Sequence, residues 1–303
     1  MKLSKIINKF RIVLIFFIIY STTSGDALLA ANKQIIYINS NKLEADRKNS
    51  IYDIEYKNGT IYVPDYRNNK IIIIGKDNLV VKTIDISQPH GIEVDSKGNI
   101  YVASFFNSRI IKFDENGVEK VNWDIKIRDL LQDIRPYSVD TDNEGNVYIA
   151  ADNLIIKVLN DGRFIKKFDF SKFNKEKVYP HGITFHENKI YVADRNSSKL
   201  LVFNIEGEYQ KSFSTLKKTD FDPPSINFYG NTHILVPNYA NSTLHIFDIN
   251  GKELKIVGGK GKGYREWFSL MNAIEDKKGN IYTVEEDSNR IQIINFLELI
   301  NSN

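Results

Sequence analysis

Two histidines lie in the same four-residue motif, Pro-His-Gly-Ile, at two places in the chain. His90 and His181 are 91 residues apart, and each motif is followed by a short alternating strand and a turn. Imidazoles from two segments that meet in space can hold a divalent metal or accept a proton from a ligand. The alternative is that both rings cap the start of a strand, or that duplication of a repeat copied them. Which interpretation holds depends on how the surrounding elements place the two rings.

The two motifs belong to a unit that occurs six times. Each unit has a short alternating strand, a turn rich in Gly and Asn, and further strands of β-branched and aromatic residues. Four antiparallel strands about every 44 residues are typical of a β-propeller blade. The pattern therefore predicts an all-β fold, a six-bladed β-propeller with four antiparallel strands per blade. The residues taken as equivalent in the first strands are Ile54, Ile92, Val139, Ile183, Ile226 and Ile274.

The two ends of the repeat array suggest how the ring closes. The sixth unit has no obvious fourth strand in residues 290–300, and residues 34–40 form a strand without a hairpin partner. Pairing the two segments would remove both exposed sheet edges. We therefore expect the N-terminal strand to seal the sixth blade. Residues 124–134 have apolar side chains at helical spacing, which predicts a short helix that covers one mouth of the ring or connects two blades at its rim.

The first 31 residues differ in character from the rest. Lys2, Lys5, Lys9 and Arg11 precede the apolar run 12–20, and small residues follow it. This order indicates an export signal, and the run is shorter than the roughly 20 residues that span a bilayer. The alternative is an uncleaved anchor. We expect residues 1–31 to be removed and residues 32–303 to form one propeller domain, secreted or periplasmic, monomeric and without a stable membrane anchor.

The charge of the chain bears on a nucleic-acid partner, and its cysteine content bears on disulfides. The chain has 41 basic and 38 acidic residues, of which four and one lie in residues 1–31. The remaining 37 basic and 37 acidic residues cancel, so electrostatics gives no reason to expect a nucleic-acid partner. No cysteine is present, and therefore no disulfide supports the fold.

Residues 257–295 resemble an NHL repeat. The glycine-rich lead-in is followed by Phe268, and then by residues that match the pattern of the NHL family, Asp276, Gly279, Asn280, Asn289 and Arg290. Asp95, Gly98, Asn99, Asn107 and Arg109 repeat the motif in the second unit. The resemblance implies a six-bladed propeller scaffold and says little about chemistry. The stretch "GGKGKG" lacks the strand–loop–helix context of a phosphate-binding loop, so we interpret it as a blade linker.

Two groups of NHL-like enzymes carry histidines at the position of the motif. Peptidyl-hydroxyglycine amidating lyases hold zinc with three such histidines from alternate blades and carry an arginine in an Ala-Asp-Arg sequence. Streptogramin B lyases use histidines and a divalent cation. His90, His181 and Arg195 match these positions, whereas the third histidine is replaced by Asn272, or by Met271 if the register shifts by one. The resemblance to the amidating lyases is therefore partial.

The geometry of a propeller predicts which other residues share a mouth with the histidines. The second strand of each blade returns to the mouth where the first strand begins, and its end brings in Phe105 and Asp152, among others. Arg195 either clamps a ligand or pairs with Glu286 or a neighbouring loop. The function expected is that of a module that binds a small ligand or a protein; the alternative is a metal-dependent lyase or hydrolase, with zinc or calcium on His90 and His181. The predicted ligand-binding residues are His90, His181, Arg195, Asn272, Glu286, Tyr66 and Tyr239.

Overall fold

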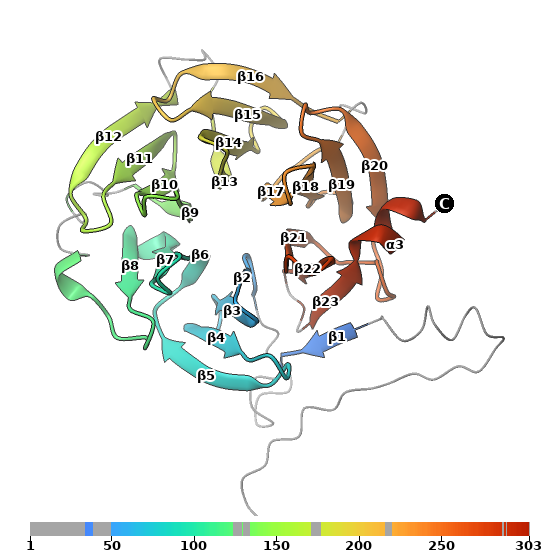
Figure 1. The fold of residues 1–303 in the computed structure, drawn as a ribbon, viewed down its shortest axis with the longest axis horizontal. Coiled ribbons are helices and arrows are strands. Elements are labelled where there is room, and N and C mark those ends of the chain that lie inside the picture. The colour runs from blue at the N-terminus through green and yellow to red at the C-terminus, as the bar shows by residue number, and fades with distance from the viewer. Residues whose placement is uncertain are drawn as a thin grey trace, which may run out of the picture.

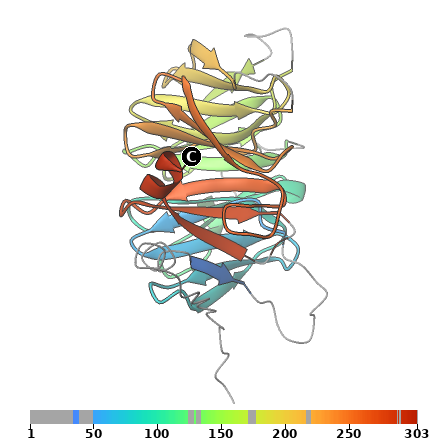
Figure 2. The ribbon, with the colours of Figure 1, turned by 90° about the vertical axis from the view of Figure 1, so that its right-hand side faces the viewer.

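A computed structural model describes residues 34–38, 50–123, 129, 134–170, 177–215, 220–286, 288 and 290–302. In these residues the strands form six antiparallel sheets around one axis (Figure 1), and the ring is a disc when seen from the side (Figure 2). The predicted six-bladed propeller is therefore confirmed. The predicted signal, residues 1–31, lies outside the described residues, as does most of the predicted helix over 124–134. Among the described residues, no helix is both long and apolar enough to cross a membrane.

The first three blades run from the axis to the rim (Figure 1). Blade one consists of β2 (Glu55–Lys57), β3 (Thr60–Asp65), β4 (Lys70–Ile74) and β5 (Val80–Asp85). Blade two consists of β6 (Pro89–Val94), β7 (Ile100–Ser104), the 3-10 turn η1 (Phe105–Asn107) and β8 (Arg109–Phe113). In its described part, an isolated bridge between Phe113 and Glu119 takes the place of a fourth strand. Blade three consists of β9 (Pro136–Thr141), β10 (Val147–Ala151), β11 (Leu154–Val158) and β12 (Phe164–Asp169).

The other three blades complete the ring in the same direction. Blade four consists of β13 (Pro180–His186), β14 (Lys189–Asp194), β15 (Lys199–Asn204) and β16 (Tyr209–Phe213). Blade five consists of β17 (Asn227–Tyr229), β18 (His233–Asn238), β19 (Thr243–Asp248) and β20 (Glu253–Gly258). Blade six consists of β21 (Leu270–Glu275), β22 (Asn280–Glu285), β23 (Arg290–Asn295) and β1 (Gln34–Tyr37), and the helix α3 (Phe296–Asn301) follows β23.

The N-terminal strand seals the ring, as the sequence predicts. β1 lies antiparallel to β23, with Gln34 opposite Ile293 and Tyr37 opposite Arg290 (Figure 1). Ile36 and Ile38 are buried in one hydrophobic cluster with residues of blades one and six. The first and last parts of the chain therefore share a sheet and a core.

The repeated Asp-x-x-Gly-Asn sequence forms the turn between the first two strands of a blade. In blade two, Oδ1 of Asp95 accepts hydrogen bonds from the backbone N–H groups of Lys97 and Asn99 at 2.8 and 2.9 Å. Oδ2 of Asp95 accepts from the Asn99 amide and from the Tyr101 hydroxyl. Gly98 has a φ of +83°, in the region that favours glycine. The same contacts recur at Asp142 and, except for the tyrosine hydroxyl, at Asp276.

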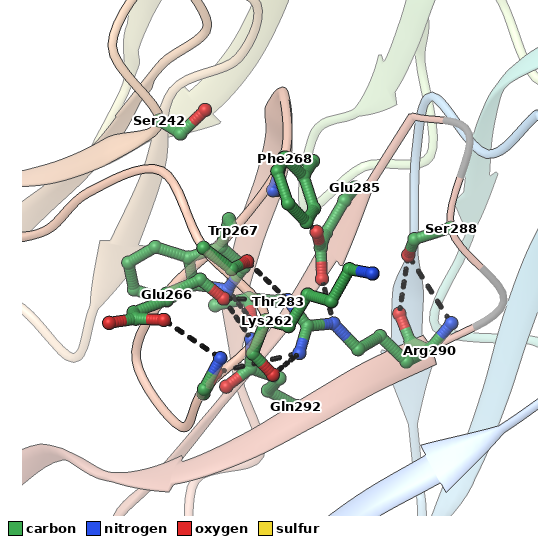
Figure 3. Close-up of polar contacts among 12 residues, drawn as sticks. Ser242, Lys262, Glu266, Trp267, Phe268, Thr283, Glu285, Ser288, Arg290 and Gln292 are labelled. Atoms are coloured by element: carbon green, nitrogen blue, oxygen red, sulfur yellow. Dashed lines mark hydrogen bonds and ion pairs between the residues drawn. The ribbon is translucent and has the colours of Figure 1, made fainter.

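The glycine-rich loop before β21 is wrapped around the side chain of Arg290 (Figure 3). The guanidinium pairs with Glu285, and both side chains are buried, with 9% and 0% exposed. Nη1 donates to the Lys262 carbonyl at 2.6 Å, and Nη2 donates to the carbonyls of Gly261 and Glu266 at 3.1 and 2.8 Å. The loop is therefore held by its own backbone carbonyls, which agrees with its interpretation as a scaffold linker.

Candidate functional site

Buried polar side chains at the ends of the second strands hold the loops of one mouth. Oδ1 of Asp194 accepts from the Tyr179 N–H at 2.8 Å, and Oδ1 of Asn238 accepts from the Asp222 N–H at 2.9 Å. In blade six, Oε2 of Glu285 accepts from the backbone N–H of Phe268 at 2.6 Å. These contacts fix the loops that precede the first strands against the ends of the second strands. The residues that follow the three anchors are Arg195, Tyr239 and Glu286.

The structure brings the two histidines together at this mouth. Each is the extra residue of a β-bulge: β6 pairs Pro89 with Ser104 and Gly91 with Ala103, which leaves His90 unpaired, and β13 does the same around His181. The ring centroids are 5.3 Å apart. A bulge aims a side chain away from the regular ladder, and here it aims both rings at the axis.

Both histidines are neutral imidazoles with the same tautomer. Nδ1 of His90 lies 2.9 Å from the Tyr137 carbonyl, and Nδ1 of His181 lies 2.8 Å from the Pro224 carbonyl, each in the next blade. Because a carbonyl only accepts, Nδ1 carries the proton and Nε2 keeps its lone pair. Burial lowers the pKa of His90 to about 4 and the pKa of His181 well below its usual value.

The glycine of the motif explains why Pro-His-Gly occurs twice. A Cβ on Gly91 would lie 2.6 Å from the Tyr137 carbonyl oxygen, and a Cβ on Gly182 would lie 2.6 Å from Cα of Ser225. Only glycine lets the first strand approach the backbone of the next blade this closely. That approach is what allows each histidine to reach its carbonyl acceptor.

The pairing register identifies which residues replace histidine in the other blades. In β21 the bulged residue is Met271, because Leu270 pairs with Glu285 and Asn272 pairs with Val284. Ala273, rather than the predicted Ile274, is therefore equivalent to Ile92. Asn272 is buried one residue deeper, where it donates to Asp53 and accepts from the Ser225 hydroxyl at 2.9 Å. The structure thus separates Asn272 from the mouth, where Met271 takes the third histidine position.

A cavity of about 760 Å³ opens at the mouth, and we call it the mouth cavity. The Tyr52 ring stacks on His90 at 4.5 Å with an angle of 11°, and its hydroxyl donates to Glu286 at 2.9 Å. The Tyr137 ring lies 5.2 Å from His181. The remaining lining residues are Tyr66, Phe105, Phe106, Tyr179, Arg195, Asn196 and Asp222.

Arg195 is held in the wall of this cavity by a neighbouring loop. Its Nε and Nη2 donate to the two carboxylate oxygens of Asp222. The guanidinium also lies over the ring of Tyr239, 5.2 Å from the centroid. The positive charge helps to lower the pKa of both histidines. Arg195 therefore forms an ion pair with a neighbouring loop, and its partner is Asp222 rather than Glu286. Nη1 takes no part in this pair.

Beneath the mouth cavity lies an axial chamber of about 270 Å³ that shares His90 and His181 with it. The first strands of blades one to three, together with Asp53 just before β2, place four carboxyl groups in the chamber. Burial raises the pKa of Asp53 to about 6, of Asp140 to about 7 and of Glu55 to about 8, and it raises that of Glu93 well above its usual value. Protonated carboxyls therefore persist in the folded protein near neutral pH.

We expect the free energy of unfolding to fall as pH rises from about 6.5 to about 8.5. Carboxyls whose folded pKa is raised stay protonated in the folded state but ionise when the chain unfolds. Each unit of pKa difference costs about 1.4 kcal/mol once the pH exceeds the folded pKa. The two histidines affect the free energy of unfolding only below this pH window. Their pKa in the folded protein lies under that of the unfolded chain, so both states are neutral at higher pH.

Chemical denaturation at both ends of the pH range measures this effect. Glu55→Gln is expected to stabilise the protein at both ends of this range and more strongly at the alkaline end, because the unfolded carboxyl is already ionised at the acidic end. Glu115, an exposed glutamate, offers the matched control, and Glu115→Gln should behave like the wild type at both pH values. A stability that rises with pH, or an equal response of the two variants, contradicts the proposed protonation of the chamber.

The donor set at the mouth does not fit a closed metal site. Within the described residues, no group of three or more His, Cys, Asp or Glu side chains could hold a metal ion. Structural zinc sites have four protein ligands and catalytic zinc sites have three, and calcium takes six to eight oxygens. Two imidazoles supply only part of a zinc site and none of the oxygens that calcium needs. A metal here would require the ligand or water to complete its coordination.

Sequence reasoning missed several residues that the structure places in the site. Tyr52 and Tyr137 occupy the histidine position in blades one and three. The signal was present, because each tyrosine stands two residues before the equivalent Ile or Val, as His90 does. The chamber acids Glu55, Glu93 and Asp140 follow that Ile or Val directly. Asp222 lies in a loop and carries no such signal.

Comparison with solved structures shows the fold. A catalytically inactive histidine-to-alanine variant of virginiamycin B lyase from Staphylococcus aureus, solved with quinupristin, is 13% identical and has a TM-score of 0.62; the match covers 86% of this chain and 98% of that one. A gluconolactonase from Xanthomonas campestris is 12% identical with a TM-score of 0.64, over 89% and 93% of the chains. No protein-family model matches the sequence, and no curated protein matches it.

Proposed function

We propose that this protein is an exported, NHL-type propeller that binds a small polar ligand in the mouth cavity. The observation that carries the proposal is the pair of neutral imidazoles, 5.3 Å apart, in an aromatic cavity of about 760 Å³. A pocket with apolar walls and a few convergent polar groups is the usual form of a small-molecule site. The needs of the scaffold alone do not account for a buried and a partly buried histidine that both keep a free Nε2 lone pair.

The groups at the mouth define the chemistry of the ligand. Nε2 of His90 and Nε2 of His181 accept hydrogen bonds, and Nη1 of Arg195 donates one. Tyr52, Phe105 and the other rings favour a flat or apolar body. The ligand therefore has a hydrogen-bond donor next to an oxygen acceptor, and both are attached to a ring or another apolar group.

A thermal-shift screen of small polar metabolites tests this proposal. Compounds that bind the mouth cavity should raise the Tm of the wild type and of His233→Ala, since His233 lies on β18 outside this cavity. The same compounds should leave the Tm of His90→Ala/His181→Ala unchanged. Shifts that persist in the double variant, or the absence of any compound that shifts the wild type, would rule out the mouth cavity as a small-molecule site.

A metal-dependent lyase or hydrolase is the second candidate, and the tautomer of the histidines favours it. A neutral imidazole with a free Nε2 can act as a general base, and the carbonyl acceptors hold each ring in position. One of the similar solved structures is a lyase that a histidine-to-alanine substitution inactivates. Metal analysis separates the two candidates. Stoichiometric zinc in the wild type that is lost in His90→Ala/His181→Ala supports an enzyme. A wild-type protein that contains no metal and still binds the compounds from the screen supports a binding module.

A further inference from the structure

A second cavity lies at the opposite end of the axis, and the strand β13 connects the two places. β13 begins next to His181 at the mouth cavity and ends at His186, five residues or about 17 Å further along. There a pocket of about 670 Å³ opens over the turns that follow β13, β17 and β21. We call it the far pocket. Its lining shares no residue with the mouth cavity, and it shares only Phe185 and Lys277 with the axial chamber.

The floor of the far pocket is made of aromatic rings that are each supported from behind. His186 stacks on Phe228 at 3.7 Å with an angle of 9°, and Tyr229 stacks on Phe296 at 3.7 Å with an angle of 18°. His186 and Tyr229 are partly exposed and line the pocket. A ring that is backed on one face and open on the other offers a rigid apolar surface to a ligand.

Polar side chains stand around this floor on the hairpin turns. Glu187, Asn231 and Lys277 are exposed at the rim. Glu275 accepts the Gly230 N–H at 2.9 Å through Oε2, and this bond leaves Oε1 for another donor. The wall therefore combines carboxylate acceptors, an amide that both donates and accepts, and one ammonium donor.

We propose that the far pocket binds a carbohydrate. A sugar ring has an apolar face of C–H groups that packs on an aromatic ring, and its hydroxyls both donate and accept hydrogen bonds. Glu187, Asn231 and Glu275 provide partners of both kinds around His186 and Tyr229. The site is independent of the ligand proposed for the mouth cavity.

The charges and rings of the far pocket argue against two other classes of ligand. A nucleotide or sugar phosphate needs cations, whereas two carboxylates outnumber the single Lys277 at this wall. A planar heteroaromatic ligand is best held between two parallel rings. In the far pocket the near-parallel rings are already in contact with each other, so a ligand reaches only one face of each.

Saturation-transfer NMR with free monosaccharides tests the proposal on the whole protein. Glucose, galactose, N-acetylglucosamine and rhamnose are added singly at millimolar concentration. At least one sugar should receive saturation from the wild type. The double variant Glu187→Gln/Asn231→Ala replaces one exposed carboxylate with an amide and removes one exposed amide, and it should weaken the binding of that sugar about tenfold or more.

A matched variant at the other mouth distinguishes the two sites. Phe106 lines the mouth cavity and is 62% exposed, so Phe106→Ala should leave the sugar signal unchanged. The Tm of the double variant shows whether it is folded. Absence of saturation from all four sugars, or a signal that the folded double variant retains, overturns the proposal. A signal lost in Phe106→Ala but kept in the double variant would place the sugar at the mouth cavity instead.

Discussion

Replacing Arg290 with alanine is expected to lower the free energy of unfolding by about 3–5 kcal/mol. The guanidinium is the partner of the fully buried Glu285, and it also binds four backbone carbonyls of the loop before β21 (Figure 3). Truncation would leave a buried carboxylate without its counter-ion and the carbonyls without donors. Glu285 also accepts the backbone N–H of Phe268, so the damage would reach the mouth.

Urea denaturation of Arg290→Ala and two comparison variants measures this effect. Arg290→Lys keeps the charge but loses the planar fork of donors, so an intermediate loss is expected. Lys260→Ala changes an exposed side chain of the same loop and should stay within about 0.5 kcal/mol of the wild type. If Arg290→Ala and Lys260→Ala are equally stable, the guanidinium does not organise the loop.

Deletion of residues 34–40 is expected to open the ring and to cost about 3–6 kcal/mol, from two isoleucine side chains at about 1.5–3 kcal/mol each. Ile36 and Ile38 are only 6% and 2% exposed, and they pack with Ile291 and Ile293. Without β1, the edge of β23 would also lose its antiparallel partner and face solvent. The deletion therefore removes core and sheet pairing together.

Thermal melting compares this deletion with point variants in the same strand. Ile36→Ala should lower the stability by about 2–5 kcal/mol. Tyr37→Ala alters the neighbouring side chain, which is 46% exposed, and should have a small effect. A truncated protein that melts at the same temperature as the full chain would show that β1 is dispensable for closure.

The turn chemistry made the scaffold predictable. Asp95, Gly98 and Asn99 each have a defined role in a tight hairpin, and the repetition of that set reveals the blades. The unpaired strand at 34–40 was equally informative, because a propeller must close. The hydrogen bonds of a turn and the pairing of a hairpin depend on residues that are close in the sequence, so the sequence alone predicts them.

The site was predictable only in part. The histidines, Arg195 and the residues at the ends of the second strands were placed at one mouth from the direction of the strands. The bulge in β21 places Met271, rather than Asn272, at the position of His90. The sequence marks this register, because Met271 precedes the turn residue Asp276 by five residues, as His90 precedes Asp95, whereas equating Ile274 with Ile92 favoured Asn272. Asp222 reaches Arg195 from a loop of the next blade, and the chamber carboxyls come from three blades. Contacts of this kind depend on how separate blades pack.

Long-range ¹H–¹⁵N NMR of the histidine rings is the most direct test of the mouth cavity as the functional site. With a compound from the thermal-shift screen added, we predict that the Nε2 resonances of His90 and His181 shift together. Both rings should show the Nδ1–H tautomer of a neutral imidazole before and after addition, and the signals of His233 and His245 should stay in place. Charged rings near neutral pH, or shifts confined to the other histidines, would contradict the account.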